Sequence, residues 1–77
     1  MVSAAHKLHN ARAILADYRE HGERLWNRFK GGRAGTLWYY RSLVKAYRET
    51  KGPPRALIDE LDRVVSELER AAAAASV

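Results

Sequence analysis

The fold of this chain is decided by the stretch PRALIDELDRVVSEL, residues 54–68. Its apolar side chains recur at three- and four-residue steps: Leu57, Ile58, Leu61, Val64, Val65 and Leu68. Because a helix turns once in about 3.6 residues, this spacing places an apolar stripe along one helix face. Pro54 suits the first turn, where a backbone donor is not needed. The stretch therefore predicts a terminal amphipathic helix over residues 54–75.

Two earlier segments, residues 3–21 and 36–50, show the same helical spacing of apolar residues. We expect Ser3 to cap the first of these helices, because a serine hydroxyl can accept from a free amide. Gly22 should follow its end, since glycine tolerates positive φ. Thr36 is expected to cap the second helix in the way that Ser3 caps the first. The pattern thus predicts two further amphipathic helices.

The connecting segments differ from these helices in length and composition. Residues 23–29 carry three large apolar side chains at helical spacing, which predicts a short helix folded over a neighbour. Residues 30–35 hold three glycines in six positions, which is typical of a loop. Prolines within residues 51–54 should end the second helix, because proline lacks an amide hydrogen and restricts the preceding residue. With no strand-like alternation, we predict an all-α fold of three main helices plus one short helix, in a single domain over residues 1–77.

The side chains expected in the core or in an interface are large apolar members of these helix faces. They are Leu8, Leu15, Trp26, Trp38, Tyr40, Val44, Leu57, Leu61, Val64 and Leu68. A chain of 77 residues has a small core, and this one has no cysteine with which to form a disulfide. Two of the predicted helices have apolar faces wide enough for more than one neighbour. We therefore expect a homo-oligomer.

The charge of the chain is unevenly distributed. The net charge is +5, but residues 1–55 carry twelve Lys and Arg against four Asp and Glu, whereas residues 56–77 carry two against five. A basic surface attracts phosphates, nucleic acids or acidic partners. The acidic segment could instead neutralise the basic body, within one chain or between two. Basic residues alternate with aromatic ones between Arg24 and Arg48, a mixture that can stack on bases, although helical spacing favours burial of the aromatic side chains.

The N-terminal residues and the length of the apolar runs bear on localisation. No apolar run approaches the ~20 residues that span a bilayer. The first six residues provide neither a basic region nor an apolar stretch of a secretory signal. We therefore expect a soluble cytoplasmic protein that does not bind membranes.

Two motifs relate the chain to a known family. KLHNAR at residues 7–12 and LWYYR at residues 37–41 occur in the order and at the distance found in HD-domain metal phosphohydrolases. The chain most resembles the Rel/Spo-type hydrolases of (p)ppGpp, guanosine tetraphosphate and its relatives, over about residues 2–47. The resemblance implies an HD-domain-like C-terminal portion over residues 2–50, within a partial helical bundle. It also implies a divalent metal such as manganese, with His6 at the family's aspartate ligand position and Asn10 near the nucleotide.

The remaining metal ligands of that family lie on earlier helices, which have no counterpart in this chain. Metal-assisted hydrolysis needs a bound cation to acidify water and to neutralise phosphoryl charge. His6 and His9 lie three residues apart, but zinc usually takes three or four protein ligands, so a site would need His21 or carboxylates from a second copy. No serine lies in a nucleophile motif. We expect no catalytic residues and no bound cofactor in the chain on its own.

Three functional interpretations follow. The leading one is a truncated phosphohydrolase-like protein, non-catalytic on its own, that acts through self-association or through binding of a partner protein. The second is half of a split metal-dependent nucleotide phosphohydrolase that a partner chain completes. The third, which the helical spacing of the aromatic residues disfavours, is a small basic nucleic-acid-binding protein.

Overall fold

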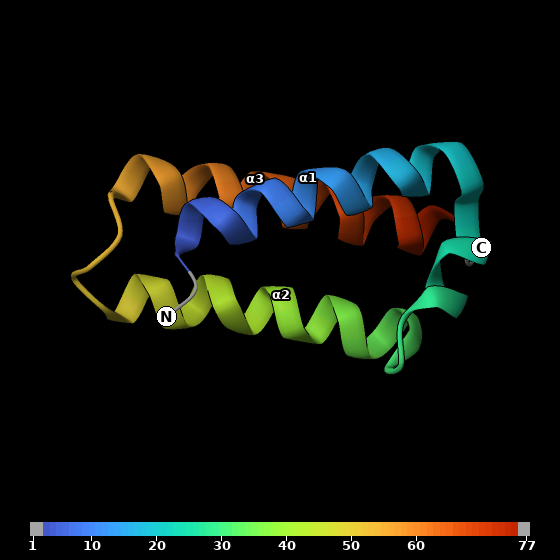
Figure 1. Ribbon diagram of the computed structural model, residues 1–77, viewed down its shortest axis with the longest axis horizontal. Helices are drawn as coiled ribbons and strands as arrows, with labels where there is room; N and C mark the ends of the chain where they lie inside the picture. Colours follow the sequence, from blue (N-terminus) through green and yellow to red (C-terminus); the bar gives the residue numbers. More distant parts are fainter. Residues whose placement is uncertain (1–2, 76–77) are drawn as a thin grey trace.

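The computed structural model describes residues 3–75 and shows helices lying side by side along its long axis (Figure 1). α1 spans Ala4–His21, α2 spans Gly32–Glu49 and α3 spans Arg55–Ala75, while the 3-10 helix η1 spans Gly22–Arg28. The described residues contain no strand. The all-α prediction is therefore confirmed. The predicted domain, 1–77, also includes residues 1–2 and 76–77, which lie outside the described residues.

α3 is the central element of the core, because it packs against both α1 and α2. The buried side chains of α3 are Ile58, Leu61, Val64, Val65, Leu68 and Ala72. Leu61, Val65 and Leu68 have no exposed surface. The apolar stripe predicted from residues 54–68 therefore packs against a helix on either side. The chain reverses direction twice to bring the three helices together (Figure 1).

The ends of α1 follow the predicted capping residues. The Oγ of Ser3 accepts a hydrogen bond from the backbone N–H of His6 at 3.2 Å. Gly22 has a φ of 66°, and its N–H donates to the carbonyl of Tyr18. Both assignments are confirmed, because a serine oxygen satisfies an otherwise unpaired amide and glycine adopts the left-handed backbone without steric cost.

The short helix η1 closes one end of the molecule and is held by its own side chains. Leu25 and Trp26 are buried, and the ring of Trp26 lies 5.4 Å from that of Tyr18 between centroids. The carboxylate of Glu23 accepts from the hydroxyl of Tyr18 and from the indole N–H of Trp26. These bonds, the one from Tyr18 first, lower the pKa of Glu23. The predicted short helix is thereby fixed to α1.

The start of α2 corrects the sequence prediction. The helix begins at Gly32, four residues before Thr36, and the N–H of Gly35 donates to the carbonyl of Gly31 at 3.1 Å. Thr36 is buried inside α2, so it does not cap the helix. Glycine in a helix costs only about 1 kcal/mol relative to alanine, and packing of the following turns on α3 compensates for that cost.

α3 begins and ends close to its predicted limits. The carbonyl of Pro54 accepts from the N–H groups of Leu57 and Ile58, so this proline precedes the first helical residue, Arg55. The alanine run continues the helix as far as Ala75. None of the helices within residues 3–75 is long and apolar enough to cross a bilayer.

Most of the predicted core residues are buried. Those that are buried are Leu8, Leu15, Trp26, Tyr40, Val44, Leu61, Val64 and Leu68. Leu57 is partly buried and packs against the core. Trp38 is 70% exposed, so it does not lie in the core of the single chain, and its assignment to an interface stays a prediction. Trp38 lies two residues from each of the buried residues Thr36 and Tyr40. Because two residues make about half a helical turn, the side chain of Trp38 points away from α3.

Candidate binding surface

The histidines proposed as metal ligands are spread over the surface of α1. His6 and His9 are exposed, and His21 lies beside Glu20 at 3.9 Å. Within residues 3–75 no group of three or more histidine, cysteine, aspartate or glutamate side chains is arranged to hold a metal ion. His6 makes a contact of another kind, since its backbone N–H completes the cap at Ser3. Metal binding by His6 across an interface remains a prediction.

Asn10, the residue matched to the family's nucleotide contact, is half-buried on α1. It lies one turn from Lys7, which reaches across to α2. Its role in binding a nucleotide remains a prediction.

Lys7 of α1 and Tyr39 of α2 contact each other across the two helices. The Nζ of Lys7 donates to the hydroxyl of Tyr39 at 2.6 Å and lies 4.9 Å from the ring centroid. This hydrogen bond is the main cause of a raised Lys7 pKa. The contact links the two motifs of the family resemblance, because Lys7 opens KLHNAR and Tyr39 lies within LWYYR.

An open hollow lies beside Tyr39 at the start of α2. Its volume is about 550 Å³, and its lining includes Phe29, Gly31, Gly35, Trp38 and Tyr39. Gly35 has no neighbouring atom within 4 Å of the position that a Cβ would occupy. Trp38 at 70% and Tyr39 at 41% are the large hydrophobic residues that remain exposed among those described.

A second hollow lies at the opposite end of α2, where α1 begins. Its volume is about 510 Å³, and its lining is mainly apolar, with Ala5, Ala46, Tyr47, Pro53 and Leu57 among the residues. The recess lies where the start of α1, the end of α2, the segment after α2 and Leu57 of α3 meet. α2 therefore carries the exposed indole of Trp38 toward one end and borders an apolar recess, lined also by Leu57 of α3, at the other.

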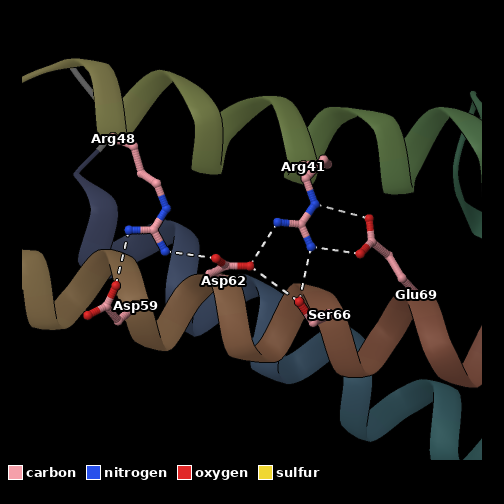
Figure 2. A network of polar contacts seen from close by, with 6 residues as sticks. All are labelled: Arg41, Arg48, Asp59, Asp62, Ser66 and Glu69. Atoms are coloured by element: carbon pink, nitrogen blue, oxygen red, sulfur yellow. Dashed lines mark hydrogen bonds and ion pairs between the residues drawn. The ribbon is translucent and has the colours of Figure 1, made fainter.

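The opposite flank of α2 is closed by a polar network with α3 (Figure 2). Arg41 donates to both carboxylate oxygens of Glu69, at 3.2 and 2.7 Å, and to Asp62 at 2.8 Å. Asp62 also accepts from Arg48 at 2.7 Å. The pKa of Arg41 is raised, first by Glu69, whereas that of Asp62 is lowered to about 2, first by Arg41.

Two more arginines connect α1 to α3. Arg12 lies 2.8 Å from Glu60, and Arg19 lies 3.0 Å from Glu67. Arg63 joins these pairs, because it contacts the same two carboxylates from within α3. The acidic last segment therefore neutralises the basic body within one chain, which was one of the two arrangements considered from the charge distribution.

The cross-helix ion pairs were not predicted from the sequence. Asp59 contacts Arg48, and Glu67 contacts Arg19. A signal was present, because Asp59, Asp62, Ser66 and Glu69 step by three, four and three along one side of α3. Which arginines meet that acidic row depends on helix register, and local spacing does not determine it.

Comparisons of the chain with protein-family models, with curated protein sequences and with solved structures each find no match.

Proposed function

We propose that this chain is a non-catalytic helical binding module that docks another protein chain on the outer side of α2. The observation that carries the proposal is the 70% exposure of Trp38 beside Tyr39. The other tryptophan, Trp26, is buried and hydrogen-bonded. An exposed indole next to an apolar hollow is typical of protein interfaces, where tryptophan, tyrosine and arginine contribute most of the binding energy.

The arrangement of the charges supports protein binding over nucleic-acid binding. Within residues 3–75, six of the ten arginines form ion pairs with carboxylates of the same chain: Arg12, Arg19, Arg28, Arg41, Arg48 and Arg63. Binding to nucleic acid gains affinity from cations that neutralise phosphates. An arginine that is already paired would have to exchange a carboxylate for a phosphate, so it would add little to the free energy of binding to nucleic acid.

The family resemblance supports the same proposal. α1 and α2 carry its two motifs and are linked by the hydrogen bond from Lys7 to Tyr39; together they are the unit that the resemblance covers. On our proposal this unit is the C-terminal portion of an HD-domain-like fold that is used for binding. The split-phosphohydrolase and nucleic-acid interpretations are the alternatives.

The proposal can be tested by site-specific photo-crosslinking in cells. A photoreactive phenylalanine derivative replaces Trp38 in one variant and Arg70 in a matched control, because Arg70 is exposed on α3. We expect a crosslinked protein product from position 38 and none from position 70, and its mass reports whether the captured chain is a second copy or another protein. Absence of any crosslink at position 38 at native expression levels, or equal yields at both positions, would contradict the proposal.

A further inference from the structure

The outer face of α2 is a stripe of five positions that turns away from α3. Stepping by three and four residues, these positions are Gly35, Trp38, Ser42, Ala46 and Glu49. Trp38, Ala46 and Glu49 are exposed, and Gly35 and Ser42 are partly exposed. Residues at such steps share one helix face. The stripe therefore combines one bulky side chain with three small residues and ends in a carboxylate.

The positions of the stripe are spaced symmetrically about Ser42, so that the stripe can pair with the same stripe on an antiparallel second copy of α2. Trp38 lies four residues before Ser42 and Ala46 four residues after it, while Gly35 and Glu49 lie seven residues before and after. Two copies of α2 that meet antiparallel about a twofold axis at Ser42 would place each tryptophan opposite an alanine. A large side chain facing a small one is the pairing that lets two helices interdigitate.

The recess beside Ala46 offers room for the incoming indole. Its volume is about 510 Å³, and Ala5, Tyr47 and Pro53 are among the residues around it. Trp38 of the same chain cannot enter it, because eight helical residues separate Trp38 from Ala46, about 12 Å along α2. A tryptophan can reach the recess only from another molecule.

The charges at the two ends of α2 complement each other in the same arrangement. Glu49 at the C-terminal end and Lys30 just before the N-terminal end are both exposed, and neither has a partner among the described residues. The first turn of α2 contains no acidic residue, and Gly31 provides no side-chain cap. Antiparallel pairing would bring Glu49 near the start of the other α2, where its negative charge meets Lys30 and the positive end of the helix dipole.

We propose that a second copy of this chain docks antiparallel along the outer face of α2, with Trp38 of each copy packed against Ala46 of the partner subunit. This inference rests on the proposed function and names the partner. The face is one helix of 18 residues, about 27 Å long, which is narrower than most stable interfaces. The dimer is therefore weak, with a Kd in the range of about 10 to 100 µM.

The first test is sedimentation velocity of the full chain at concentrations from about 1 µM to about 1 mM, which brackets the Kd given above. The wild-type protein shifts from monomer to dimer across this range. Trp38→Ala raises the Kd about 30-fold, the change expected for loss of a central interface tryptophan. Arg70→Ala is the matched control and leaves the Kd unchanged. Circular dichroism confirms that each variant retains its helices.

The second test is an exchange of charges, which reports the antiparallel orientation. Lys30→Glu or Glu49→Lys alone raises the Kd about fivefold, because like charges then face each other at each end of the pair. The double variant restores the wild-type Kd. Arg70→Glu, with the same change in net charge as Lys30→Glu, serves as the control.

The outcomes separate this inference from the proposed function. A chain that stays monomeric at all concentrations overturns docking by a second copy, and a crosslink from position 38 to a different protein would still support the binding module. A dimer that withstands Trp38→Ala, or double-charge variants without rescue, overturns the antiparallel arrangement. Failure of both the crosslink and the dimer overturns the two proposals together.

Discussion

At the scale of single residues, Asp62 is the point on which the contact between α2 and α3 converges. One carboxylate oxygen accepts from Arg41 and the other from Arg48, while the hydroxyl of Ser66 donates to the first (Figure 2). Charge-assisted hydrogen bonds of this kind are shorter and stronger than neutral ones. Since the two arginines lie seven residues apart on α2, a shared acceptor on α3 fixes the register of the two helices.

The lowered pKa of Asp62 predicts how stability depends on pH. The pKa falls from an ordinary value of 3.8 to about 2 in the folded chain, so the charged form stabilises the fold above pH 3.8 and this contribution disappears as the pH falls to about 2. We expect the free energy of unfolding to decrease across that window. In Asp62→Asn it should be lower by about 1 kcal/mol at neutral pH, after allowance for solvent screening, and should change less with pH.

Urea unfolding at several pH values between 2 and 7 measures this difference. Asp59→Asn is the control, because Asp59 contacts Arg48 and its side chain is 59% exposed. If the free energies of unfolding of the wild type and of Asp62→Asn change in parallel down to pH 2, the arginine contacts do not stabilise the charged form of Asp62.

At the scale of elements, helical periodicity predicted the three α-helices, whereas local conformational preference misplaced the start of α2. Gly31, Gly32 and Gly35 are typical of a loop, yet the helix begins at Gly32 because its later turns are held on α3 by Tyr40 and Val44. The pattern also did not distinguish a core tryptophan from an exposed one at Trp38. That distinction depends on where the neighbouring helices lie, and single-helix spacing does not contain this information.

Two glycines, one inside α2 and one at the end of α1, predict opposite responses to alanine. Gly35 lies inside α2 with open space around its Cβ position, so Gly35→Ala should stabilise the fold by about 0.5 to 1 kcal/mol. Gly22 has a φ of 66°, which alanine adopts only with strain, so Gly22→Ala should destabilise the fold by about 1 kcal/mol. Thermal unfolding at low protein concentration compares the two variants. Equal shifts for both would contradict the assigned backbone conformations.

At the scale of the whole molecule, α3 unites the structure because the other two helices both pack against it. Leu68→Ala removes a side chain with no exposed surface at that seam, and we expect a loss of about 3 kcal/mol. A chain of this length has little stability in reserve, so much of the variant should unfold. Hydrogen exchange should show α1 and α2 losing protection together, while Leu57→Ala, at a partly buried site, has a smaller effect. Protection retained in α2 alone would indicate separate folding units.

The position of α3 in the chain has a consequence for biosynthesis. The helix that completes the core and carries the acidic row is made after α1 and α2, which means that a ribosome releases two basic amphipathic segments before their counterpart has emerged. During that interval their apolar faces and cationic side chains are exposed and can contact ribosomal RNA and chaperones. The core can therefore be completed only after α3 has been synthesised.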